Sequence, residues 1–143
     1  MALAALVTWV VTAGGGFILL ATWLGRDGMK QRTGGRIKAP LILAHFVLAA
    51  AGLVLWIAYV ATDEDVYAWI AFALLAIVAL LGFTMFAIWA QQRQSRQPRP
   101  APAAGEPAEP AEQHFPVPIV ALHGLLAVLT VVLALLAVLE VGG

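Results

Sequence analysis

The sequence predicts an all-α membrane protein, a four-transmembrane-helix bundle built from a tandem duplicated helical hairpin. Hydrophobic residues make up 62% of the 143 residues, charged residues make up 11%, and the mean hydropathy is +0.92. A single soluble core of this size cannot bury so much apolar surface, so lipid must cover it. Four apolar segments are each long enough to cross a hydrocarbon core of about 30 Å. The predicted spans are residues 2–24, 40–60, 66–90 and 118–138.

The second half of the chain repeats features of the first half. Residues 40–60 begin with a proline that is followed five residues later by a histidine, and so do residues 118–138. The segments before them share glycine, phenylalanine, alanine and tryptophan at identical spacing: Gly16, Phe17, Ala21 and Trp23, then Gly82, Phe83, Ala87 and Trp89. A duplicated hairpin is the simplest explanation, and each hairpin then supplies one histidine.

The first span, residues 2–24, contains no charged residue. A cleavable signal peptide would begin with basic residues and have a shorter apolar stretch, whereas here the basic residues follow the segment. We therefore expect a span that stays attached, with its N-terminus outside. The glycine run at residues 14–16 favours close packing of a neighbouring helix. It lacks the lysine and the preceding strand of a phosphate-binding loop.

The loop at residues 25–39 is polar and basic, and Pro40 suits the first turn of the second helix. Residues 61–65 predict a tight acidic turn before the third helix. All eight Lys and Arg residues lie in residues 25–39 and 91–117, whereas four of the acidic residues lie at the opposite ends of the spans: Asp63, Glu64, Asp65 and Glu140. The positive-inside rule therefore predicts that both loops are cytoplasmic and both termini lie outside the plasma (inner) membrane.

Residues 91–113 differ in composition from the rest of the chain. They are rich in proline, alanine and glutamate and contain no large apolar residue. Such a segment buries too little surface to offset the entropy of ordering. We predict a disordered cytoplasmic linker, inserted into the second copy of the duplicated unit.

Side chains for catalysis are scarce. The sequence has no cysteine and no asparagine, its only serine is Ser95 in the linker, and no carboxylate lies inside a span. Neither a nucleophile with its base nor a carboxylate proton relay can be assembled. We expect no independent catalytic activity, and at most an electron-transfer role. A formal charge of zero gives no indication of nucleic-acid binding.

His45 and His123 are the candidate ligands for a cofactor. Both lie one to two turns inside the predicted cytoplasmic ends of two parallel helices. A duplicated hairpin has a pseudo-two-fold axis along the membrane normal, which can bring the two rings together across the bundle. Neutral imidazole is a good ligand for haem iron, so we expect one haem b with His45 and His123 as its metal ligands.

Small or modest residues follow each histidine on the same helix face, where they would leave room for the macrocycle. These candidate cofactor-binding positions are Ala49, Gly52, Ala127 and Thr130. Basic side chains at the nearby interface can neutralise the propionates. They are Arg26, Arg36, Lys38 and Arg93.

The helices that read HFVLAAAG and HGLLAVLT from these histidines make the chain resemble bis-histidine membrane b-type cytochromes in general. The resemblance covers the second and fourth helices and implies a haem b for electron transfer or haem handling. Many of those cytochromes carry more histidines and a second haem. This chain is therefore expected to hold one haem near the cytoplasmic face and to need a redox partner.

A second interpretation is a non-catalytic accessory or structural subunit of a larger membrane complex. Its Gly- and Ala-rich helix faces would pack against another membrane protein or a second copy of the chain. The histidines would then bond to a carbonyl or to each other. A third interpretation is that the chain is a subunit of a small-molecule exporter. All three interpretations have membrane lipids as partners, and His114 is expected to be a wetted interfacial residue.

Overall fold

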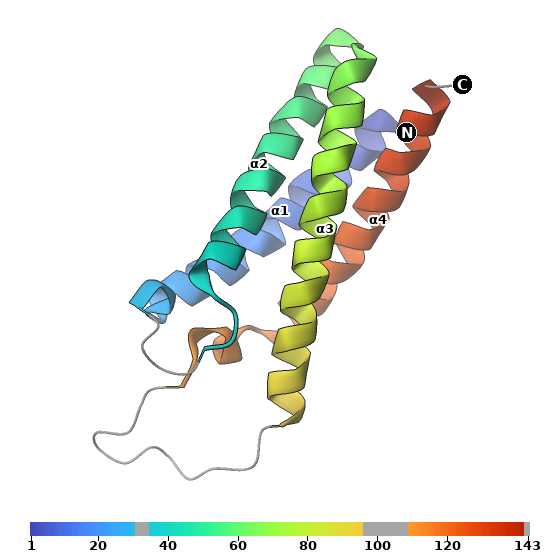
Figure 1. Cartoon of the computed structure of the whole chain (residues 1–143). Helices are drawn as coiled ribbons and strands as arrows, with labels where there is room; N and C mark the ends of the chain where they lie inside the picture. The colour runs from blue at the N-terminus through green and yellow to red at the C-terminus, as the bar shows by residue number, and fades with distance from the viewer. Residues whose placement is uncertain (31–34, 96–108, 142–143) are drawn as a thin grey trace.

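A computed structural model describes residues 1–30, 35–95 and 109–141 of the chain (Figure 1). Four long α-helices account for most of it: α1 Ala2–Gly25, α2 Ala39–Thr62, α3 Asp65–Gln94 and α4 Val117–Val141. Two short 3₁₀ helices, η1 Gly28–Lys30 and η2 Ala111–His114, lie between them. All four long helices are long and apolar enough to cross a membrane. The predicted all-α, four-helix class is confirmed, and the length and apolar composition of the helices are compatible with a multi-pass membrane protein.

The helix boundaries agree closely with the predicted spans. Pro40 lies in the first turn of α2, where the missing N–H leaves no bond unmade. α2 ends in a left-handed residue, Asp63, with φ 59°, and the N–H of Asp63 donates to the carbonyl of Tyr59 at 2.8 Å. Aspartate is one of the few residues that tolerate this conformation. The tight acidic turn that follows connects α2 directly to α3.

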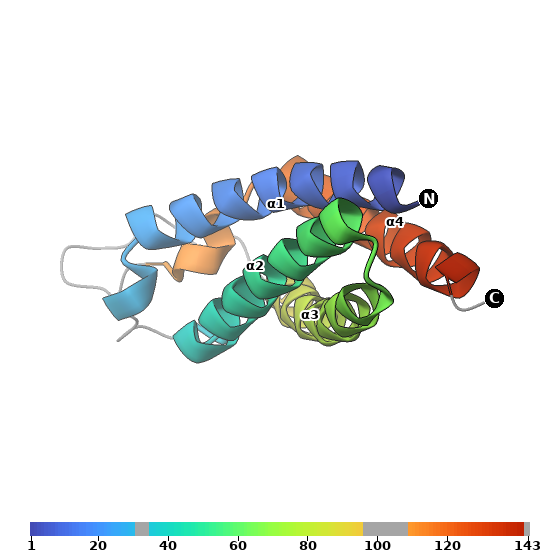
Figure 2. The same ribbon diagram turned by 90° about the horizontal axis from the view of Figure 1, so that it is seen from above.

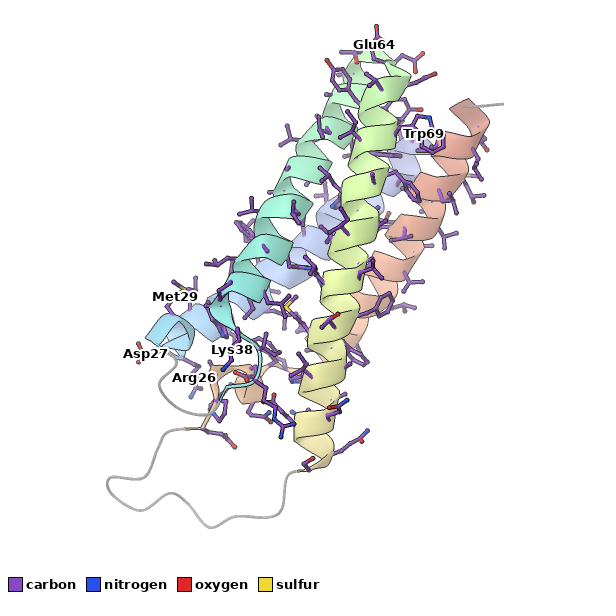
Figure 3. All side chains as sticks on the ribbon, in the orientation of Figure 1. Arg26, Asp27, Met29, Lys38, Glu64 and Trp69 are labelled. Carbon is purple, nitrogen blue, oxygen red and sulfur yellow. The ribbon has the colours of Figure 1, made fainter. Side chains whose placement is uncertain are left out.

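The helices pack as two pairs, α1 with α4 and α2 with α3, and the contacts between the pairs are fewer (Figure 2). Both termini and the α2–α3 turn lie at one end of the bundle (Figure 1). We call this the acidic end, because it carries residues 63–65 and Glu140. The opposite end carries Arg26, Lys38 and the last turn of α3 (Figure 3), and we call it the basic end. The duplicated-hairpin origin remains a prediction.

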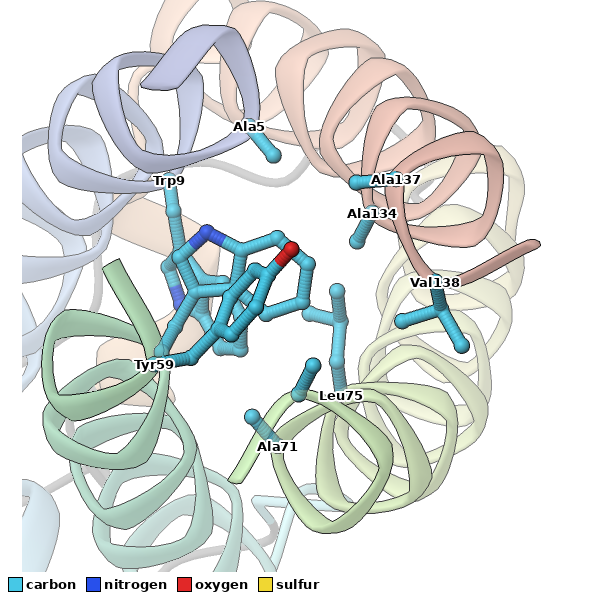
Figure 4. Close-up of a cluster of buried hydrophobic side chains, with 10 residues drawn as sticks. Ala5, Trp9, Tyr59, Ala71, Leu75, Ala134, Ala137 and Val138 are labelled. Atoms are coloured by element: carbon cyan, nitrogen blue, oxygen red, sulfur yellow. The ribbon is translucent and has the colours of Figure 1, made fainter. Parts of the chain in front are cut away.

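The bundle core lies in the acidic half (Figure 4). The rings of Trp9 and Trp56 lie 6.1 Å apart, and Tyr59 contacts Trp56 edge to face at 5.3 Å. The Trp56 indole N–H donates to the carbonyl of Ala2 at 3.1 Å. Small residues of α1, α3 and α4 make room for these rings, namely Ala5, Ala68, Ala71, Ala134 and Ala137. Such close packing stabilises helices in a membrane, where lipid is as apolar as the side chains.

The basic end is closed by η2, which packs against α1 and α3. Its Glu112 is fully buried. One carboxylate oxygen, Oε1, accepts hydrogen bonds from the backbone N–H groups of Arg36 and Ile37, at 2.9 and 3.5 Å, and from the side-chain amide of Gln92 at 3.3 Å. A buried carboxylate needs such donors to compensate for its lost hydration. This single residue joins η2, the segment just before α2 and the end of α3.

The structure therefore differs from the predicted linker at both of its ends. Residues 91–94 continue α3, and residues 109–114 pack against the helix ends. Hydrogen bonds of the buried Glu112 side chain help to hold the latter segment. The middle of the predicted linker, residues 96–108, lies outside the described residues.

Candidate functional site

The imidazole rings of His45 and His123 lie next to each other, with centroids 6.4 Å apart and ring planes inclined by 59°. Each histidine is six residues after the first residue of its helix, α2 or α4. At 1.5 Å per residue, both lie about 9 Å from the start of the helix. The structure thus places the two histidines at equal distances from the starts of their helices, with their rings next to each other.

Each ring is held by a backbone carbonyl of a neighbouring helix. Nδ1 of His45 lies 3.1 Å from the carbonyl oxygen of Val78 in α3, and Nδ1 of His123 lies 2.9 Å from that of Thr12 in α1. A carbonyl oxygen only accepts, so Nδ1 carries the proton and Nε2 of a neutral ring has a free lone pair. Within the described part of the chain, neither Nε2 makes a hydrogen bond. Metal-bound histidines commonly have this arrangement.

Two glycines let the rings approach these neighbouring helices. A Cβ atom added to Gly82 would lie 3.2 Å from Cε1 of His45, and one added to Gly16 would lie 3.1 Å from Cε1 of His123. Each glycine follows by four residues the carbonyl that holds the ring, which is one helical turn. Both rings therefore lie across one turn of a neighbouring helix in the same manner. In the sequence, the identical spacing of these glycines served only as evidence of a repeat. The same spacing also indicates that each glycine contacts the histidine of a neighbouring helix.

At two of the positions expected to leave room for a macrocycle, side chains of α1 fill the neighbouring space. Gly52 is buried against Trp9, so that a Cβ there would lie 3.1 Å from the indole ring. Thr130 is 1% exposed, and its hydroxyl lies 3.3 Å from that of Thr12. The space between the histidine pair and the acidic end of the bundle is therefore filled by side chains. The other two positions, Ala49 and Ala127, are half-buried.

The side chains around the histidines and on their basic side are half-buried or exposed. We call residues 13–22, 39–51, 79–88 and 117–129 the histidine layer, and none of them is fully buried. The layer is bounded toward the acidic end by one buried residue from each helix, Thr12, Gly52, Val78 and Thr130. Toward the basic end it is bounded by buried Trp23, Ile37, Trp89, Ala111 and Glu112. A planar group between the histidines would therefore extend toward the basic end.

The basic side chains expected near a cofactor are those of the basic end. Arg26, Arg36 and Lys38 are exposed there, and the guanidinium of Arg93 lies 5.2 Å from the centre of the Trp89 ring. His114 is on η2, where its Nε2 lies 3.7 Å from a carboxylate oxygen of Glu109. The structure thus separates His114 from the other two histidines and gives it a carboxylate partner.

The donor set of the site restricts which metal group it suits. Among the described residues, no group of three or more His, Asp or Glu side chains that could hold a metal ion is found. A bare divalent ion between the histidines would have two protein ligands, whereas zinc sites use three or four. A porphyrin brings its own four nitrogens and needs only axial ligands. Two histidines therefore suit haem better than a bare ion.

No family model, curated protein or solved structure matches this chain. The function is therefore argued from the histidine layer and the basic end themselves.

Proposed function

We propose that this multi-pass membrane protein binds one b-type haem between His45 and His123, for electron transfer or haem handling. The observation that carries the proposal is the ring pair itself, with centroids 6.4 Å apart and both Nδ1 atoms bound to backbone carbonyls. Metal–imidazole bonds are about 2 Å long, so two Nε2 atoms that share one ion lie about 4 Å apart. The spacing of the ring centroids is compatible with that separation.

The chain's own residues would bind and orient the cofactor. The carbonyls of Thr12 and Val78 fix the tautomer and the direction of each ring, as partners of metal-bound histidines do. Because His45 is on α2 and His123 is on α4, a cofactor held by both would be bound between the α2/α3 pair and the α1/α4 pair, where helix contacts are fewer. No residue of the histidine layer is fully buried there. Bound haem supplies a one-electron redox centre.

The depth of the histidines indicates where electrons would be exchanged. Both lie about 9 Å from the basic-end start of their helices, in a hydrocarbon core about 30 Å thick. One haem at that depth is close to the basic end and far from the acidic end. It would exchange electrons with a partner on the basic side or within the membrane. Electron transfer across the whole membrane would need a second redox centre.

Support for the duplicated hairpin comes from the contacts of the two rings. Gly82 follows Gly16 by 66 residues, and Val78 follows Thr12 by the same interval. These are the glycines and carbonyls that contact the two histidines. A pseudo-two-fold axis that exchanges α1 with α3 and α2 with α4 accounts for the matched contacts and for the matched helix pairs.

The test is a reduced-minus-oxidised spectrum of protein purified after growth with a haem precursor. Wild type should show a six-coordinate, low-spin haem, and His45→Ala and His123→Ala should each lose that species because each removes one axial ligand. The matched control is His114→Ala, whose spectrum should equal that of wild type because His114 lies on η2. A wild type without haem, or a spectrum insensitive to both ligand variants, would leave the accessory-subunit interpretation.

A further inference from the structure

We propose that the indole N–H groups of Trp23 and Trp89 hydrogen-bond the carboxylates of the cofactor held by His45 and His123, an inference that rests on the proposed function. Trp23 is 0% exposed and Trp89 is 7% exposed. In both, Nε1 is buried and has no acceptor among the described residues. A buried indole N–H in a native protein normally has a partner, so an unpaired one indicates a missing acceptor.

The positions of the two tryptophans relate them to the histidines. Trp23 follows Gly16 by seven residues, and Trp89 follows Gly82 by seven residues. Seven residues are close to two full helical turns and rise about 10 Å. Each tryptophan therefore lies on the helix face whose glycine contacts a histidine ring, two turns nearer the basic end.

A porphyrin with its iron between the histidines matches this arrangement. Haem b carries two carboxylates on one edge of the macrocycle. The filled acidic side of the site directs the macrocycle toward the basic end, and that edge then lies in the region of the two indoles. Two carboxylates and two donors on pseudo-equivalent helices agree in number. The structure thus assigns the binding of the carboxylates to a specific pair of neutral donors. The sequence alone predicts that role for arginine and lysine side chains.

Basic side chains lie at the same end of the bundle as the indoles, together with the fully buried side chain of Glu112. Arg93 lies over the Trp89 ring at 5.2 Å, and further basic residues lie at the same end. η1 closes over the Trp23 ring, because a Cβ at Gly28 would collide with it. Among the described residues, the other unpaired buried side-chain polar atoms are Oε1 of Gln113 and Nδ1 of His114, both on η2. An amide oxygen cannot donate, and His114 is not on a helix whose glycine contacts a histidine ring.

The experiment compares haem with haem dimethyl ester, which lacks both carboxylates. Apo full-length protein in detergent is titrated with each compound, for wild type, Trp23→Phe, Trp89→Phe and the double variant. Wild type should bind haem more tightly than the ester. A hydrogen bond to a charged group implies a loss of about 10-fold in haem affinity for each indole removed. Affinity for the ester should change little, so that the double variant loses most of its preference for haem.

The matched control is Trp69→Phe, because Trp69 is 46% exposed near the acidic end (Figure 3). It should keep the wild-type preference for haem. Equal wild-type affinities for haem and ester would overturn the inference without use of any variant. A histidine-dependent haem whose preference survives in the double variant would overturn it and leave the proposed function intact. A wild type that binds neither compound would overturn both.

Discussion

His123 and Gly16 are in such close contact that a Cβ atom on the glycine would lie 3.1 Å from Cε1 of the imidazole. His45 and Gly82 stand in the same relation, at 3.2 Å. Each ring thus occupies space that a side chain on the neighbouring helix would take. A small residue at such a contact lets two membrane helices approach each other. Here it also places a ring nitrogen within reach of a carbonyl on that helix.

We predict that Gly16→Ala and Gly82→Ala each displace a histidine ring by a few tenths of an ångström. Overpacking of this kind costs about 1 kcal/mol or more, so the melting temperature in detergent should fall and haem occupancy should fall with it. The control is Gly14→Ala, because a Cβ at Gly14 meets nothing within 4 Å. Alanine is also the better helix former there. Equal losses in Gly14→Ala and Gly16→Ala would contradict the contact.

Glu112 gives a second prediction. Its replacement by alanine leaves the N–H groups of Arg36 and Ile37 and the amide of Gln92 without their acceptor. Lost hydrogen bonds to a buried charge predict a loss of about 2–3 kcal/mol in the free energy of unfolding. Thermal unfolding in detergent measures the loss, and faster amide hydrogen exchange at Arg36 and Ile37 would locate it.

The control for this prediction is Glu64→Ala, because Glu64 is exposed in the turn at the acidic end (Figure 3). Surface substitutions of this kind usually change stability by no more than about 0.5 kcal/mol. If Glu112→Ala were as stable as Glu64→Ala, the buried carboxylate would not hold η2 in place.

The sequence was sufficient to predict the four helices, because long apolar segments separated by polar ones have few alternatives in a membrane protein. It also predicted the equal depth of the histidines, because the repeat has a proline and a histidine in register. It did not predict which helices pair. Lipid-facing and core-facing surfaces are equally apolar here, so periodicity gives no inner face. The attachment of His45 to α3 and of His123 to α1 therefore needed the structure.

Tertiary contacts also determined the rest of the candidate site. Gly52 and Thr130 are small in the sequence, but the side chains that fill the space beside them come from α1, far away in the chain. Nothing in the composition of residues 91–113 distinguishes Glu112 from the glutamates before it. Glu112 is set apart by the backbone donors that residues 36 and 37 bring to it. Long-range contacts of this kind have no local sequence signal.

Orientation in the membrane is the last prediction, and it decides on which side the histidine layer lies. The positive-inside rule predicts that the basic end is cytoplasmic. The native chain has no cysteine, so single thiols can be placed at Ser95 and Glu64, which are exposed at opposite ends of α3. In intact cells an impermeant thiol reagent should label Glu64→Cys, whereas Ser95→Cys should react only after permeabilisation. The reverse pattern would place the basic end, and a haem bound near it, on the outer side of the membrane.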